Sequence, residues 1–90
     1  MGDNRDSFAR DWSLKWDQGV VVGFARERLD RTRAVGMLRT AHRRMGVDRK
    51  DLRAILDVVR DSPVYLPGLT KEEKAARMRP LREALIAKEI

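Results

Sequence analysis

Six basic side chains lie close together near the middle of the chain, where they could bind an anionic partner. They are Arg39, Arg43, Arg44, Arg49, Lys50 and Arg53. Guanidinium and ammonium groups bind phosphate oxygens through charge-assisted hydrogen bonds. Residues 19–47 hold seven Arg against two acidic residues, a net charge of +5 in a chain of net charge +6. This pattern predicts a nucleic-acid partner, although a general preference for Arg, which supplies fifteen of the twenty basic residues, is the alternative explanation.

Catalytic and metal-binding groups are sparse by comparison. His42 is the only histidine and cysteine is absent, so thiol chemistry and thiolate metal sites are excluded. The carboxylates of Asp48, Asp51, Asp57 and Asp61 alternate with basic residues, which is typical of a salt-bridged helix surface. The glycines form neither a P-loop nor a dinucleotide fingerprint. We predict that the protein is not an enzyme and uses no metal or cofactor.

Two helices must position the basic residues, and the apolar spacing predicts them at 31–45 and 48–61. Asp30 and Thr32 are candidate caps of the first helix, Asp48 is the candidate cap of the second, and Gly46 suits a left-handed position after the first helix. The apolar stripes, which repeat every three or four residues, are Ala34, Met37, Leu38, Ala41 and Met45 in the first helix, and Leu52, Ile55, Leu56 and Val59 in the second.

A further helix is predicted after the connection 63–69, whose Val64-Tyr65-Leu66 we expect to tuck against the core. Thr70 and Glu73 have the spacing of a capping box. The apolar side of this helix holds Ala75, Met78, Leu81 and Leu85. Pro80 predicts a kink, or two short helices that meet near Arg79. The candidate contact with a partner or a second copy consists of Met78, Leu81, Leu85 and Ile86.

The N-terminal part has two interpretations. Phe8, Trp12 and Trp16 recur every four residues, as on one side of a helix, whereas the alternation around Trp12 and Trp16 also fits a β-hairpin at 12–24. Helix is favoured. The expected fold is therefore mainly α, a single domain of about four helices over 1–90, with 1–6 flexible. The alternative is an α+β fold with the hairpin.

The segment Leu38–Asp57, LRTAHRRMGVDRKDLRAILD, resembles the helix-turn-helix of DNA-binding domains. Gly46 would form the turn and Val47 would fill the angle between the helices. The resemblance implies that Arg49, Lys50 and Arg53 face the major groove, while Arg39, Arg43 and Arg44 contact phosphates. His42 stands where this family has a small residue, usually Ala. The alternative is a plain corner between two helices of a small bundle.

A second resemblance covers residues 23–59, which are similar to the ANTAR domain, a three-helix module that binds RNA hairpins in bacterial antitermination. Gly23, Ala34, Leu38 and Arg39 fall where that family has a Gly, an Ala and a Leu-Arg pair. Val21 stands where that family has an alanine, and about three additional residues separate the second and third helices. This resemblance implies an RNA target.

Together these features predict a small basic nucleic-acid-binding protein of transcription regulation, with DNA favoured over RNA. The rival hypothesis is an inhibitor or adaptor that docks on a larger protein through the C-terminal helix or the Trp segment. Both hypotheses are compatible with a homodimer. The polar N-terminus and the absence of a long apolar stretch predict a cytoplasmic protein without a membrane segment.

Overall fold

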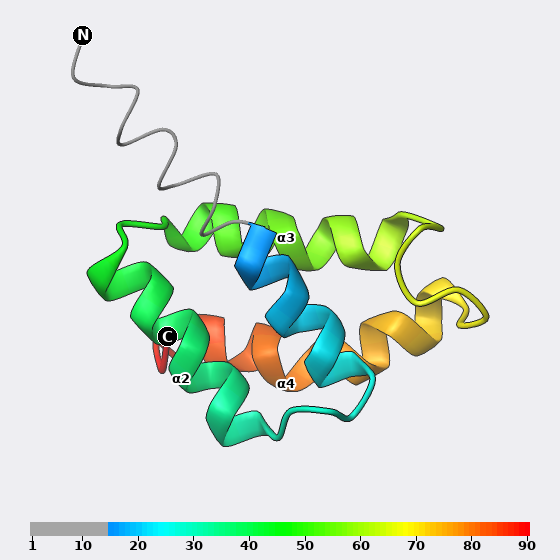
Figure 1. Cartoon of the computed structure of the whole chain (residues 1–90), viewed down its shortest axis with the longest axis horizontal. Coiled ribbons are helices and arrows are strands. Elements are labelled where there is room, and N and C mark those ends of the chain that lie inside the picture. The colour runs from blue at the N-terminus through cyan, green and yellow to red at the C-terminus, as the bar shows by residue number, and fades with distance from the viewer. Residues whose placement is uncertain (1–14) are drawn as a thin grey trace, which may run out of the picture.

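The computed structural model describes residues 15–90, which fold into helices joined by short connections (Figure 1). Residues 15–25 are helical, and α2 (Arg31–Arg44), α3 (Arg49–Asp61) and α4 (Lys71–Ile86) follow. No strand occurs within the described range. The mainly α prediction is confirmed and the hairpin alternative is wrong for residues 15–24. Phe8, Trp12 and the flexible stretch predicted for 1–6 lie outside the described residues.

The helix at 15–25 forms although its three consecutive valines are poor helix formers. Val20 and Val21 are buried together with Asp17 and Ala25, so these side chains share one face at helical spacing. Burial of that face overrides the weak local preference of β-branched residues. The chain then turns at Glu27, which has a left-handed φ of 63°, and continues towards α2.

Local signals define α2 and α3 closely. The Asp30 carboxylate accepts a hydrogen bond from the Arg33 amide at 2.8 Å, which caps α2 as expected. Asp48 occupies the N-cap position of α3, but its side chain accepts no capping hydrogen bond. The four apolar residues predicted for α3 are all buried. In α2, Val35 is buried instead of Met45, which lies 45% exposed beyond the last helical turn.

The predicted capping box at Thr70 and Glu73 is present at the start of α4. The helix continues through Pro80, so the prediction of two short helices is wrong, while its axis changes direction along its length (Figure 1). Ala75 is exposed, and Lys74 takes its place on the buried side. Lys74, Met78, Leu81 and Leu85 are spaced by four, three and four residues, which is one continuous helical face.

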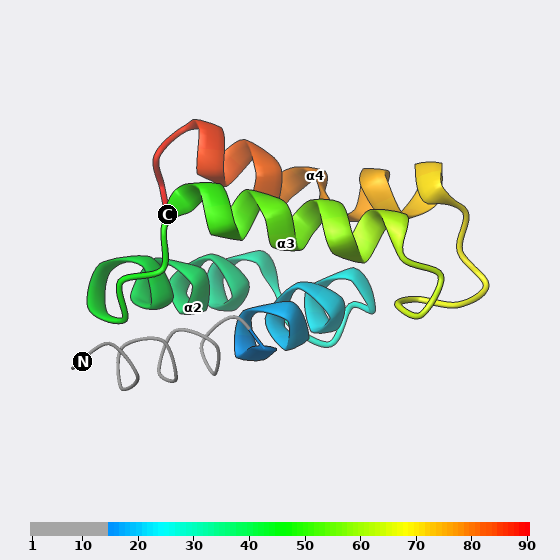
Figure 2. The same ribbon diagram turned by 90° about the horizontal axis from the view of Figure 1, so that it is seen from above.

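The core lies where these helices meet. Both α2 and α3 pack directly against α4. Viewed from above, helix 15–25 and α2 lie on one side of the molecule and α4 on the other (Figure 2). In the connection 63–69, Leu66 is buried and Tyr65 is half-buried, its hydroxyl donating to Gln18 Oε1 at 3.0 Å. Val64 is 78% exposed, so the expected burial of this tripeptide holds only for its last two residues.

Candidate nucleic-acid interface

The connection between α2 and α3 is a four-residue turn, residues 45–48, whose geometry depends on Gly46. Gly46 has a φ of 72°, a conformation that side chains disfavour. The Ala41 carbonyl accepts hydrogen bonds from the amides of Met45 at 3.2 Å and Val47 at 3.1 Å. Val47 is completely buried, as predicted for the residue that fills the angle. The two hydrogen bonds to Ala41 and the burial of Val47 therefore fix the conformation of the turn.

Four of the six predicted basic residues surround this turn with their side chains exposed. We call this set the basic corner; it consists of Arg43, Arg44, Lys50 and Arg53. Arg43 and Arg44 end α2, whereas Lys50 and Arg53 belong to the first turns of α3. Across residues 15–90, none of the four has an ion pair or a side-chain hydrogen bond. Their charges are therefore open to an external anion.

The other two predicted contact residues have structural roles. Arg49 is half-buried and donates from its guanidinium to the carbonyl oxygens of Leu85 and Ile90, the latter at 3.1 Å. Arg39 donates its Nε–H to the Glu89 carbonyl oxygen at 2.7 Å. The interpretation of Arg49 as an exposed reading residue and of Arg39 as a free phosphate contact therefore needs correction. Both side chains bind the end of the chain instead.

These arginines hold a short C-terminal segment, residues 87–90, against α2 and α3. Lys88 has a left-handed φ of 61°, and the amides of Lys88 and Glu89 bond back to the carbonyls of Leu85 and Ala84. This is the Schellman pattern of a helix end. Ile90 is 2% exposed and so joins the core. Arg31 adds an ion pair with the Glu89 carboxylate at 2.6 Å.

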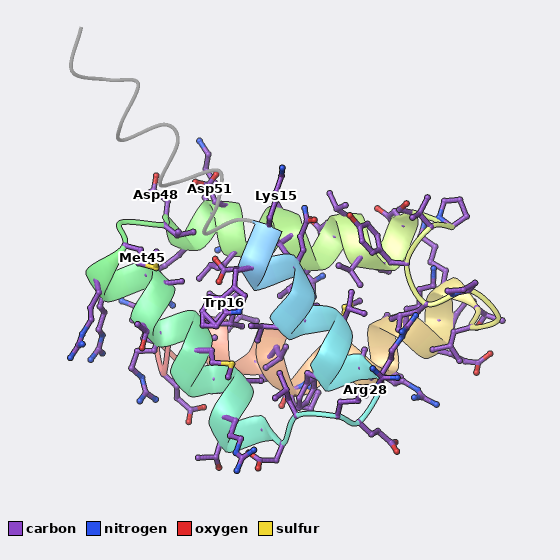
Figure 3. All side chains as sticks on the ribbon, in the orientation of Figure 1. Lys15, Trp16, Arg28, Met45, Asp48 and Asp51 are labelled. Carbon is purple, nitrogen blue, oxygen red and sulfur yellow. The ribbon has the colours of Figure 1, made fainter. Side chains whose placement is uncertain are left out.

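Two carboxylates lie beside the basic corner. Asp48 is exposed at the N-terminus of α3, and Asp51 follows in its first turn (Figure 3). Negative charge stabilises the positive end of the helix dipole, so both residues favour folding at this position. The same charges reduce the positive potential at the corner. At this corner the outer side chains, Arg43, Arg44 and Arg53, therefore offer an anion more positive charge than the helix end itself.

The predicted partner contact on α4 lies largely inside the protein. Met78, Leu81 and Leu85 are each at most 4% exposed, which makes them core residues, and the prediction of a docking surface there is wrong. Ile86 alone of this set is on the surface, at 75% exposure. From the Trp segment, Trp16 is 51% exposed beside α2.

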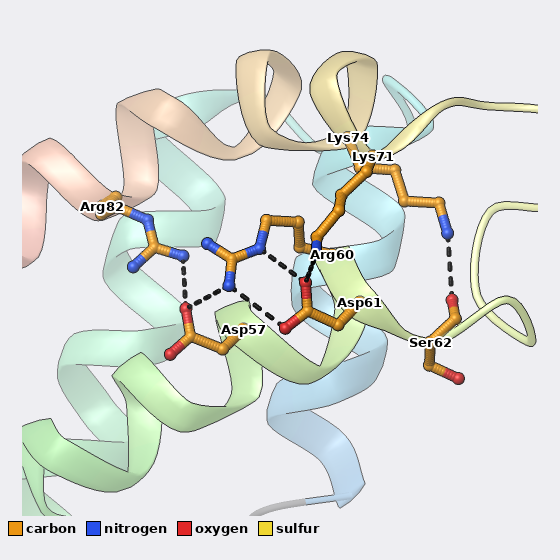
Figure 4. A network of polar contacts seen from close by, with 7 residues as sticks. All are labelled: Asp57, Arg60, Asp61, Ser62, Lys71, Lys74 and Arg82. Carbon is orange, nitrogen blue, oxygen red and sulfur yellow. Dashed lines mark hydrogen bonds and ion pairs between the residues drawn. The ribbon is translucent and has the colours of Figure 1, made fainter.

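The junction of α3 and α4 holds a polar network (Figure 4). The alternation of Asp57 and Asp61 with basic residues predicted a salt-bridged helix surface, and the network also joins α3 to α4. Arg60 makes two hydrogen bonds to the Asp61 carboxylate, of 2.8 and 3.1 Å, and Lys71 lies 3.3 Å from the same carboxylate. The bonds from Arg60, with a smaller contribution from Lys71, lower the pKa of Asp61 to about 2. Asp57 accepts from Arg82 at 2.8 Å and so connects the middle of both helices.

Sequence reasoning missed the buried Lys74, although a signal was present. Lys74 is 5% exposed and precedes Met78 by one helical turn, so the apolar stripe of α4 extends to it. Its ammonium donates to the Ser62 carbonyl at 3.0 Å, at the end of α3. No group of three potential metal ligands occurs in the part of the chain that the structure describes. Within the same range, no helix has both the length and the apolar character of a membrane-spanning segment.

The fold and the site define a small all-α protein with a cationic turn between two helices. No protein-family model matches the chain, and no curated protein or solved structure matches it significantly.

Proposed function

We propose that this protein binds nucleic acid through the basic corner and acts as a small regulatory protein. The supporting observation is that Arg43, Arg44, Lys50 and Arg53 are exposed around one tight turn and have no partner within residues 15–90. Neighbouring arginines of the same helices are engaged in internal contacts. Long cationic side chains held at one corner suit the phosphate backbone, which supplies most of the affinity in such complexes.

The arrangement favours backbone contacts over base reading. With Arg49 bound to α4, only Lys50 and Arg53 remain on the exposed side of α3 near the turn to reach a groove. Each good bidentate contact to a base gives about 1–3 kcal/mol of discrimination. We therefore expect modest sequence preference and a steep dependence on salt. Duplex DNA is the favoured target, with RNA as the alternative.

Fluorescence anisotropy with labelled duplex DNA, duplex RNA and single strands tests this proposal. We expect binding to duplex DNA to weaken linearly with salt on a double-logarithmic plot. The double variants Arg43→Ala/Arg44→Ala and Lys50→Ala/Arg53→Ala should each lower the salt slope by about 2, because each removes two phosphate contacts. Circular dichroism should show an unchanged fold.

A matched control removes the same charge from another place. Arg26 and Arg28 are exposed in the loop before α2, and Arg28 lies at the opposite end of the molecule from Met45 and Asp48 (Figure 3). The variant Arg26→Ala/Arg28→Ala should bind nearly as well as the unchanged protein. Equal losses in the control and the corner variants would show that only overall charge matters. No binding at micromolar protein and low salt would refute the proposal.

A protein-interaction role is the second candidate, and one observation favours it. An open, largely apolar groove lies between helix 15–25 and α2, lined by Trp16, Thr32, Arg33, Gly36, Met37 and Thr40. Exposed tryptophans often anchor protein interfaces. Under this hypothesis Trp16→Ala abolishes partner capture while the corner variants leave it unchanged.

A further inference from the structure

A second cationic site lies at the opposite end of α3 from the basic corner. A cavity of about 350 Å³ opens between the end of α3, the connection 63–69 and the first turn of α4. Its charged lining comes from Arg60, Asp61, Lys71 and Lys74, and its apolar lining includes Leu66 and Leu69. The cavity therefore combines three cations and one carboxylate with an apolar wall.

Lys74 is the residue that points to a ligand. Lys74 is only 5% exposed, and within residues 15–90 no carboxylate lies within ion-pair distance of its ammonium group. Buried charges in proteins are normally paired. The ammonium carries three N–H donors, and one of them is used by the Ser62 carbonyl. The C-terminal end of the α3 dipole offsets part of the charge and leaves donor capacity for an acceptor.

The single carboxylate of the cavity is already occupied. Asp61 accepts two hydrogen bonds from Arg60 and an ion pair from Lys71. It neutralises one of the three cations, so the lining keeps a net positive charge of two with Lys74 at its buried side. Figure 4 shows Lys71 and Lys74 both reaching from α4 towards the end of α3.

We propose that this cavity binds a small oxyanion of the phosphate class. A phosphate group carries up to two negative charges and several acceptor oxygens, which matches the excess charge and the free donors of Lys71 and Lys74. The apolar wall formed by Leu66 and Leu69 suits the organic part of a phosphate monoester. The site is independent of the basic corner, because the thirteen residues of α3 separate the two by about 20 Å.

Titration of the isotope-labelled protein, followed by amide NMR at constant ionic strength, tests this site. The probes are inorganic phosphate, phenyl phosphate and, as a carboxylate comparison, acetate. We expect saturable shifts in residues 60–74 with phosphate, and tighter binding of phenyl phosphate if the apolar wall contributes. Equal affinity for the two phosphates would identify free phosphate as the source of the ligand chemistry.

Two variants identify the residues responsible. Lys74→Met keeps the length and the apolar stem of the side chain and should weaken phosphate binding roughly tenfold or more, as expected for loss of a charge-assisted hydrogen bond. Lys71→Ala alters only an exposed side chain and should also weaken phosphate binding. This variant replaces Lys74→Met as the test if Lys74→Met does not fold. Lys88 is exposed on another surface, so Lys88→Ala is the control for the loss of one positive charge.

The outcomes separate this site from the proposed function. Shifts confined to residues 43–53 would overturn the cavity proposal and support the basic corner. Non-saturating shifts, or equal losses in Lys71→Ala and Lys88→Ala, would also overturn it. Saturable shifts in 60–74 that disappear in the cavity variants, in a protein that does not bind nucleic acid, would support the cavity while refuting the proposed function.

Discussion

The imidazole Nδ1 of His42 lies 2.7 Å from the main-chain carbonyl oxygen of Val47, across the turn that joins α2 to α3. A carbonyl oxygen can only accept, so the Nδ1 atom carries the proton in this contact. The half-buried imidazole therefore ties the last turn of α2 to the residue that fills the angle between the helices. This contact gives a physical reason for a histidine at this position of α2.

His42→Ala should lower the free energy of unfolding by about 1 kcal/mol, because the Val47 carbonyl loses its hydrogen bond. Urea denaturation at neutral pH measures the change. Thr40→Ala is the control: its hydroxyl bonds to the Gly36 carbonyl on an exposed helix surface, and its removal should alter stability by less than about 0.5 kcal/mol. Equal effects of the two substitutions would contradict a role for His42 in the turn.

Substitution of Arg49 should mainly lower stability, whereas substitution of Arg53 should mainly weaken DNA binding. Arg49→Ala removes the hydrogen bonds to the Leu85 and Ile90 carbonyls and should cost about 2 kcal/mol of unfolding free energy, as for bonds to a charged group. Arg53→Ala should change stability by less than about 0.5 kcal/mol and weaken DNA binding. Denaturation and anisotropy measured on both variants check this, and the reverse ranking would place Arg49 in the interface.

Two glycines of the same region should respond to alanine in opposite directions. Gly46→Ala forces a side chain into a left-handed backbone with φ of 72° and should destabilise the protein by about 1–2 kcal/mol. Gly36 lies inside α2, and a methyl group added there would meet no atom within 4 Å apart from the nearby backbone of its own helix, so Gly36→Ala should stabilise the protein by up to about 1 kcal/mol. Thermal unfolding of both variants measures the difference, and a stabilised Gly46→Ala protein would disprove the turn geometry.

Residues of α4 should divide into core and surface. Leu81 is completely buried, so Leu81→Ala should cost about 2–5 kcal/mol. Ile86 is 75% exposed, so Ile86→Asp should change stability by less than about 0.5 kcal/mol. Chemical denaturation compares them. A large loss in Ile86→Asp, together with a concentration-dependent melting temperature, would indicate that Ile86 is buried in an oligomer.

Acid should weaken the junction between α3 and α4 through Asp61. Its pKa is lowered from 3.8 to about 2 in the folded protein, so its contribution to stability is fully present above pH 4 and is lost as the pH falls towards 2. Asp61→Asn should lower the melting temperature at pH 6, and the difference from the unchanged protein should shrink between pH 4 and pH 2. A difference that is constant with pH would show that the ion pairs contribute nothing.

The features that could be predicted from the sequence are those with local causes. The capping box of Thr70 and Glu73, the left-handed Gly46 and the buried face of α3 all depend on residues within about one or two helical turns. Caps and apolar periodicity act over such short ranges, and for this reason α2 and α3 were predicted to within one residue at each end.

Which basic residues are exposed and unpaired depends on contacts between segments far apart in the chain. Arg49 contacts carbonyls 36 and 41 residues away, and Arg39 contacts one 50 residues away, so no local pattern could distinguish them from the exposed Arg43 and Arg53. The valine-rich helix at 15–25 and the buried Lys74 were likewise set by packing against other helices. Long-range partners decide burial and pairing, and these in turn decide which charges remain for a ligand.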